Sequence, residues 1–93
     1  MKITPIEAIR EEFESIDKSI LILLHQRMEL SIKMSLLKKQ NSLPVLDLIQ
    51  WNKQSKNRFR ENEKFGINPD FIQSVFNLIH EESIRIQNQE INK

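Results

Sequence analysis

The chain has no cysteine and no tyrosine, and only one glycine and three prolines among its 93 residues. The absence of cysteine excludes disulfide bonds and thiolate chemistry. Scarce glycine and proline, together with many Ile, Leu, Lys, Glu, Gln and Asn residues, favour helices over sheet. We therefore expect an all-α protein.

The chain also has no large excess of charge of either sign, because its 14 Lys and Arg residues are nearly balanced by 13 Asp and Glu residues. A formal net charge of +1 gives no broad positive field toward nucleic acid or an anionic membrane. Lys33, Lys38, Lys39, Arg58 and Arg60 are interspersed with acids, which favours a solvated helical face over a nucleic-acid interface.

Long hydrophobic runs are absent as well. No stretch approaches membrane-spanning length, and the start MKITPIEAIR lacks the apolar run of a signal peptide. We expect a cytoplasmic protein with neither a membrane nor a nucleic-acid partner.

The length of 93 residues allows one small domain, which we assign to residues 1–93. A monomer of this size buries little apolar surface, so dimerisation would add stability. Breaks at Leu43-Pro44 and at Gly66-Ile67-Asn68-Pro69 predict three helices, the first of them long. Thr4-Pro5-Ile6-Glu7 predicts a capping box, Asn68-Pro69-Asp70 a similar helix start, and Gly66 the left-handed end of the second helix.

The first predicted helix carries an apolar seam. Its members recur at alternating steps of three and four: Ile6, Ile9, Phe13, Ile16, Ile20, Leu23, Leu30, Met34 and Leu37. Arg27 occupies the one place in this series without an apolar residue. Alone, such an arginine is most simply a side chain that snorkels or pairs with a nearby Glu.

The third predicted helix has a comparable interruption. Its stripe of Ile72, Phe76, Ile79 and Ile86 includes Ser83 at an apolar place, and Gln87 lies one turn beyond. Each alone is explained by a Ser bonded to its own helix and a surface Gln. Together with Arg27, they favour a polar site.

Helix geometry sets which cations can meet. Lys38 lies eleven residues after Arg27, roughly 16 Å along the axis, so their extended side chains can converge on one small dianion. Arg10 lies seventeen residues before Arg27, roughly 25 Å away, so it can join the same site only from an antiparallel partner.

These residues, in this order, resemble the all-helical class of chorismate mutases. The resemblance covers almost the whole chain and rests on two groups of residues. The first is Arg10, Ile16-Asp17, Ile20-Leu21, Leu23-Leu24, Arg27, Leu30, Lys38, Pro44-Val45 and Asp47; the second is Gly66–Ile72, Phe76, Ile79–Ile84 and Gln87.

The resemblance implies an intertwined antiparallel homodimer of three-helix protomers, with two sites that each take one arginine from the other protomer. It implies rearrangement of chorismate, a small dicarboxylate, to prephenate, with no cofactor and no metal. Arg27 and the partner's Arg10 would hold carboxylates, Lys38 a carboxylate and the ether oxygen, Gln87 the ether oxygen, Ser83 the ring carboxylate and Asp47 the C4 hydroxyl. We expect His25 and His80 to face solvent or the core edge.

The chain departs from the family at Gln50-Trp51, where the family usually carries Arg-Glu near the ring carboxylate and the C4 hydroxyl. A lost cation weakens carboxylate binding, and an indole reshapes the pocket near C4. Both residues are therefore candidate site residues. A mutase for 4-amino-4-deoxychorismate is an alternative, since a C4 ammonium would favour Asp47.

Two further alternatives stay open. An isochorismate-pyruvate lyase shares this fold and cation cluster, although Pro44-Val45-Leu46-Asp47 favours a mutase. A non-catalytic regulatory dimer is the other, and Gln50-Trp51 is its best support. The retained polar site residues argue against it, because their desolvation costs stability unless a ligand engages them.

Overall fold

The computed structural model describes residues 2–93 of the chain. Within them lie three α-helices and no strand: α1 (Pro5–Gln40), α2 (Leu48–Asn62) and α3 (Pro69–Ile91). The prediction of an all-α, three-helix protomer with a long first helix is confirmed.

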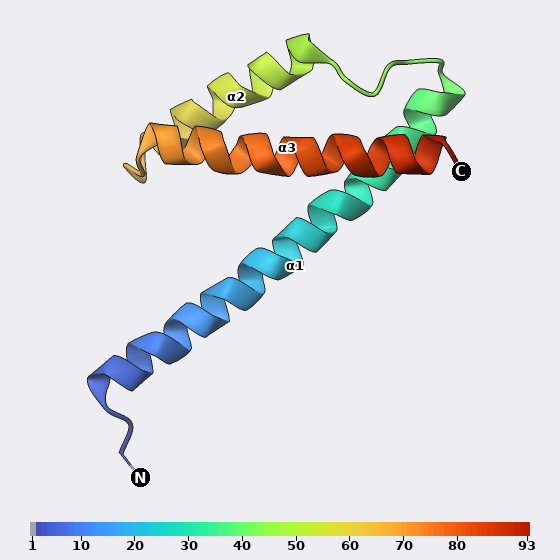
Figure 1. The fold of residues 1–93 in the computed structure, drawn as a ribbon. Coiled ribbons are helices and arrows are strands. Elements are labelled where there is room, and N and C mark those ends of the chain that lie inside the picture. Colours follow the sequence, from blue (N-terminus) through green and yellow to red (C-terminus); the bar gives the residue numbers. More distant parts are fainter. Residues whose placement is uncertain (1) are drawn as a thin grey trace.

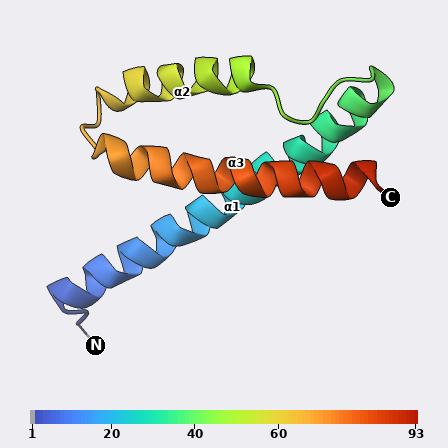
Figure 2. The same cartoon turned by 45° about the horizontal axis from the view of Figure 1, so that its top comes forward.

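The helices are arranged so that only part of α1 is covered. α3 packs across the C-terminal half of α1, and α2 lies along α3 (Figure 1). In both views the N-terminal half of α1 projects away from the other two helices (Figure 2). No helix in residues 2–93 combines the length and apolar character needed to cross a membrane.

The helix starts follow from local chemistry. Thr4 and Glu7 form the predicted capping box: the Thr4 hydroxyl accepts from the Glu7 amide at 3.2 Å, and the Glu7 carboxylate accepts from the Thr4 amide at 3.3 Å. The Asn68 side chain caps α3 by accepting from the amides of Asp70 and Phe71. Both predicted starts are confirmed.

The end of α2 also follows the sequence. The helix ends at Asn62, and a turn leads to Gly66, whose φ of +66° is the predicted left-handed conformation. The Gly66 amide donates to the Asn62 carbonyl at 2.8 Å, which closes the turn before α3.

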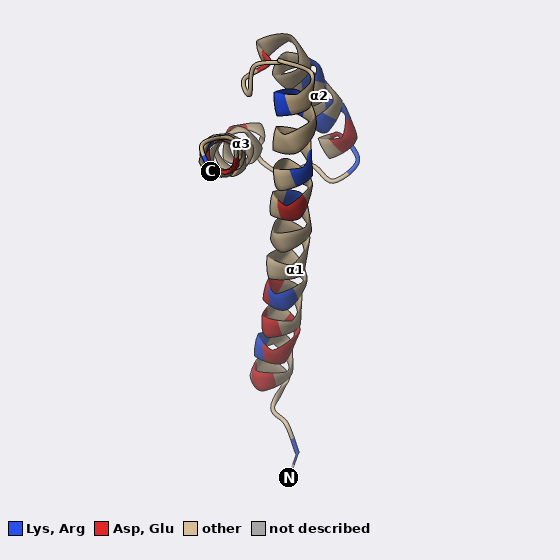
Figure 3. Cartoon of the chain, turned by 90° about the vertical axis from the view of Figure 1, so that its right-hand side faces the viewer, with Lys and Arg blue, Asp and Glu red and all other residues tan. Residues whose placement is uncertain are grey.

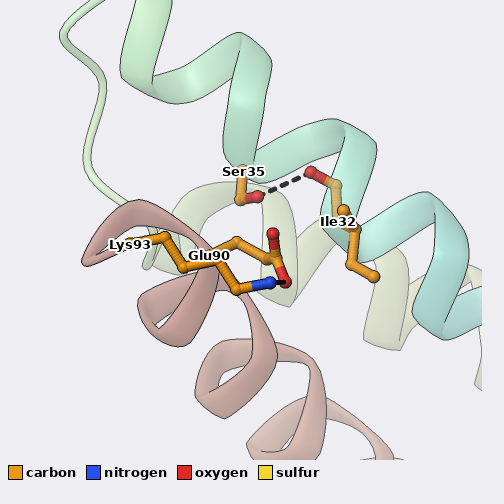
Figure 4. Close-up of polar contacts among 4 residues, drawn as sticks. All are labelled: Ile32, Ser35, Glu90 and Lys93. Carbon is orange, nitrogen blue, oxygen red and sulfur yellow. Dashed lines mark hydrogen bonds and ion pairs between the residues drawn. The ribbon is translucent and has the colours of Figure 1, made fainter.

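The crossing of α1 and α3 is polar. Among residues 2–93, those classed as buried are Ser31, Ser35 and Gln87, and no apolar side chain reaches the same burial. Ser35 is fully buried, and its hydroxyl donates to the Ile32 carbonyl at 2.6 Å; Figure 4 shows this bond together with the Lys93–Glu90 ion pair at the end of α3. Small side chains at the crossing let the two helices approach closely.

The protomer is extended. Its radius of gyration is 17.4 Å and it measures 59 × 31 × 15 Å. A compact chain of this length has a radius of gyration of about 12 Å. The apolar seam of α1 defined above, from Ile6 to Leu37, stays between 48% and 64% exposed. The protomer therefore leaves its main apolar surface uncovered.

Candidate functional site

A cavity of about 410 Å³ lies between the C-terminal half of α1, the start of α2 and the middle of α3. Its size lies within the range of small-molecule sites. The residues that line it are Arg27, Leu30, Ser31, Met34, Lys38, Val45, Asp47, Gln50, Trp51, Gln54, Phe76, His80, Ser83, Ile84 and Gln87.

The α1 wall of the cavity is one face of a helix. Arg27, Leu30, Met34 and Lys38 follow each other at steps of three and four, so all four point the same way. Lys38 is half-buried, and its ammonium donates to the Val45 carbonyl at 2.5 Å. This bond ties the segment between α1 and α2 to the cavity wall and holds the Lys38 ammonium at the site.

The α2 wall begins at a helix cap. Asp47 is the N-cap of α2, and one oxygen of its carboxylate accepts from the Gln50 amide at 3.1 Å. A carboxylate at this position is favoured by the helix dipole. The cap fixes Asp47 at the cavity edge, and the first turn of α2 places Gln50 and Trp51 beside it.

The α3 wall carries a chain of hydrogen bonds. The Ser31 hydroxyl donates to the Arg27 carbonyl at 3.1 Å, and it lies 2.5 Å from the Ser83 hydroxyl. Because Ser31 has one hydroxyl hydrogen, Ser83 must be the donor between them. The Gln87 amide nitrogen then donates to Ser83 at 3.1 Å. The direction of donation therefore runs from Gln87 through Ser83 and Ser31 to the α1 backbone.

This chain leaves Gln87 with unused hydrogen-bonding capacity. Gln87 is only 5% exposed, and its side-chain oxygen has no hydrogen-bond partner in residues 2–93. A buried polar atom left unpaired costs roughly 1–3 kcal/mol. One amide hydrogen of Gln87 also remains after the bond to Ser83. That hydrogen can be donated to a polar ligand in the cavity.

Aromatic and cationic groups stack along the α2–α3 side. The rings of Trp51 and His80 lie nearly parallel, with centroids 3.9 Å apart. The guanidinium carbon of Arg58 lies 4.7 Å from the Trp51 ring and 4.5 Å from the Phe76 ring, and that of Arg27 lies 5.9 Å from Phe76. Cation–π contact of this kind holds Arg58 against Trp51 and Phe76, behind the lining of the cavity, and Arg27 beside Phe76.

The cations near Trp51 and Phe76 affect the pKa of His80. Burial lowers the pKa of His80 from its ordinary value of 6.5, and the nearby Arg58, Arg27 and Lys38 lower it further, while Glu81 opposes them. The imidazole is therefore neutral near pH 7.

A pH dependence of stability follows. Because the pKa of His80 is lower in the folded protein, the unfolded chain binds more protons between pH 6.5 and that lower value. We expect the free energy of unfolding to fall as the pH drops through this window, and His80→Gln to reduce the slope. Urea unfolding at a series of pH values measures this change in the free energy of unfolding.

The cavity gathers seven of the eight residues predicted for the site: Arg27, Lys38, Asp47, Gln50, Trp51, Ser83 and Gln87. Arg10 is the exception; it lies exposed in the projecting half of α1 and does not line the cavity of its own protomer. The functional roles predicted for these residues stay predictions.

Several cavity residues were missed by the sequence analysis, and the polar ones among them are Ser31, Gln54 and His80. His80 was expected to face solvent or the core edge, but it lines the cavity, and Gln54 lines it one turn after Gln50. The spacing of Phe76, His80, Ser83 and Gln87, at steps of four, three and four, would have placed His80 on the site face of α3.

The cavity is suited to binding an anion. Two cations, a carboxylate and several neutral hydrogen-bonding groups face one space with apolar walls. Residues 2–93 contain no group of three His, Cys, Asp or Glu side chains placed to hold a metal ion.

Comparison with known proteins gives a consistent match. The family described as chorismate mutase type II matches residues 9–88. A bifunctional chorismate mutase/prephenate dehydratase of Buchnera aphidicola subsp. Baizongia pistaciae is 33% identical over 86 residues, which are 92% of this chain and 23% of that protein. The T-protein of Enterobacter agglomerans is 29% identical over 86 residues, again 92% of this chain and 23% of that protein.

The chain thus spans under a quarter of the length of these curated relatives. No solved structure gives a significant match.

Proposed function

This chain belongs to the chorismate mutase type II family, and from that premise we propose that it isomerises chorismate to prephenate in the cavity between its three helices. The observation that carries the proposal is the lining of that cavity, where Arg27, Lys38, Ser83 and Gln87 face one space of about 410 Å³. We assign the whole chain to a single mutase domain.

The reaction explains why such residues suffice. In the rearrangement the C–O bond of the enolpyruvyl ether breaks while a C–C bond forms, and no proton or nucleophile is required. The enzyme must hold the flexible side chain over the ring and stabilise negative charge on the ether oxygen. Fixed cations and amide donors that line the cavity can do both.

We assign the roles by position. Arg27 binds a carboxylate, because its guanidinium can engage both carboxylate oxygens. Lys38 and Gln87 donate to the ether oxygen: both line the cavity, and Gln87 keeps one amide hydrogen free of its bond to Ser83. Asp47 binds the C4 hydroxyl with the carboxylate oxygen that does not cap α2.

Ser83 lies beside the ring carboxylate in this scheme. In the structure its hydroxyl hydrogen is directed to Ser31. Binding of a carboxylate at Ser83 therefore requires this hydroxyl to rotate away from Ser31, at the cost of one hydrogen bond.

Gln50 and Trp51 line the cavity beside Asp47. The neutral Gln50 amide can donate to a carboxylate, and the stacked Trp51 indole forms a flat apolar wall.

We further propose that the working form is an antiparallel homodimer. The uncovered seam of α1 supports this, because exposed apolar stripes of this length bind a partner surface. The dimer brings the partner's Arg10 to a site that its own protomer cannot reach, since a straight helix separates Arg10 and Arg27 by roughly 25 Å.

The charge along α1 supports the antiparallel direction. Residues 5–20 contain five acidic and two basic residues, whereas residues 21–40 contain four basic residues and one acidic residue, leaving the neutral histidine aside. Figure 3 shows acidic residues gathered toward the N-terminal end of α1 and basic residues toward the other end. Antiparallel pairing sets the acidic half of each α1 against the basic half of the other.

A charge in the seam should separate the protomers. Phe13 is 62% exposed in the protomer, so Phe13→Asp would be nearly neutral in a monomer. In the dimer it buries an unpaired carboxylate, and we expect the dissociation constant to rise at least a hundredfold, or about 3 kcal/mol. Sedimentation velocity across a concentration series measures this. Ser15→Asp, off the seam on the same helix, is the matched control and should stay dimeric.

The function is tested by presenting the purified protein with chorismate, 4-amino-4-deoxychorismate and isochorismate and following the products by chromatography. We expect prephenate from chorismate as the main reaction. Faster turnover of the amino analogue would change the substrate, and salicylate from isochorismate would change the reaction to a lyase. No turnover of any of the three would contradict the proposed enzyme.

A further inference from the structure

His80 stands in the cavity with its hydrogen-bonding groups unused. One face of its ring stacks on Trp51, at 3.9 Å between centroids, and stacking leaves the two ring nitrogens at the edge. Neither nitrogen has a hydrogen-bond partner within residues 2–93. The ring is thus held in place by the stack on Trp51, and its residue lines the cavity.

The charges around His80 come from every neighbouring element. Arg27 and Lys38 face it from α1, Arg58 from α2, and Glu81 lies next to it on α3. Asp47 lines the same cavity at the start of α2. The cations keep the empty site's imidazole neutral, since a fourth nearby positive charge is unfavourable.

A dicarboxylate reverses this balance. It brings two negative charges to a cavity whose own lining carries the cations Arg27 and Lys38, opposed by the Asp47 carboxylate. Arg27 and Lys38, which repel a proton from His80 in the empty site, are then paired with carboxylates, while Arg58 lies outside the lining of this cavity. A carboxylate within roughly 4–6 Å of an imidazole favours its charged form.

We propose that His80 is a substrate-binding residue of this chain: a dicarboxylate dianion entering the cavity draws a proton onto the stacked imidazole, which then donates a charged hydrogen bond to it. The stack on Trp51 fixes the ring for this bond, and the charged ring gains a cation–π contact with the indole. The inference rests on the proposed function, because it concerns the same cavity, and it makes substrate binding proton-linked.

The test is an NMR titration of the two histidine ring signals with pH, without ligand and with saturating chorismate. Chorismate is a suitable probe because both it and any prephenate formed are dianions. We expect the midpoint of the His80 signal to rise by about one pH unit with the probe. His25, exposed and bonded to Glu29 at 2.9 Å, is the internal control and should keep its midpoint; His25→Gln assigns the signals.

Kinetics give a second readout. As the pH rises through the midpoint of the loaded site, the charge on His80 is lost, so the KM for chorismate should rise about three- to tenfold. At pH 6 the His80→Gln variant should have a higher KM for chorismate than the unaltered protein. Its KM should not change with pH, because Gln can donate a hydrogen bond without titrating.

The outcomes separate the two proposals. Turnover of chorismate with an unmoved His80 midpoint overturns the inference and leaves the function standing. A raised midpoint without turnover supports the inference as a ligand site and overturns the function. Neither turnover nor a raised midpoint overturns both. The NMR experiment uses the unaltered protein, so it does not depend on how the variant folds.

Discussion

Replacing Arg27 with alanine should lower kcat/KM for chorismate by roughly two to three orders of magnitude, or about 3–4 kcal/mol of transition-state stabilisation. Arg27 lines the cavity and is held beside the Phe76 ring, so its guanidinium is aimed at the ligand space before substrate arrives. Removal of the Arg27 guanidinium leaves a substrate carboxylate in the cavity without the cation that binds it. It also frees the enolpyruvyl side chain to leave the reactive conformation.

The two kinetic constants should both change. The KM for chorismate should rise, because the carboxylate contact exists in the ground state, and kcat should fall, because orientation is lost. Steady-state kinetics measure both, and circular dichroism checks the helix content. The matched control is Lys33→Ala, which removes a cation from the same helix at an exposed position outside the cavity. If both variants lost activity equally, Arg27 would be acting through general charge and not through a contact.

Periodicity predicted much of this site because the site is built on helices. Once α1 is known to be helical, the seam places Arg27, Leu30 and Met34 on one face, and the eleven-residue step brings in Lys38. The same rule holds on α3 for Ser83 and Gln87. The helix caps were equally local, because Thr4 and Glu7 are three residues apart and need no other part of the chain.

Contacts between different helices could not be predicted from the periodicity of each helix. The Ser31–Ser83 hydrogen bond joins residues 52 positions apart, and it exists because α1 and α3 cross at small side chains. The stack of Trp51 on His80 likewise depends on the position of α2 over α3. Asp47 lies in neither periodic stripe and entered through the family resemblance, although its place just before α2 is a typical N-cap signal.

The uncovered seam shows why a protomer alone gives an incomplete account. Its residues are apolar with helical spacing, which usually predicts burial, yet they stay about half exposed in the protomer. The apolar spacing predicts that the whole seam is buried in the working protein. In the protomer the seam stays about half exposed. The difference is the surface that we assign to a second copy.

A mixed dimer tests whether a site is shared between protomers. Arg10→Ala and Arg27→Ala should each be nearly inactive as homodimers, since each homodimer lacks one arginine at both sites. When the two variants are co-expressed with different tags and the mixed dimer is purified through both, one site receives the Arg27 of one protomer and the partner's Arg10. The other site lacks both. We expect about half of the unaltered dimer's activity to return.

The matched control combines Arg27→Ala with Lys38→Ala. Both residues line the cavity of their own protomer, so neither site of this mixed dimer is complete and activity should stay lost. Recovery in the first mixture and not in the second requires that Arg10 act across the dimer. No recovery in the first mixture would place Arg10 outside the site, and the exposed N-terminal half of α1 would then serve only to join the protomers.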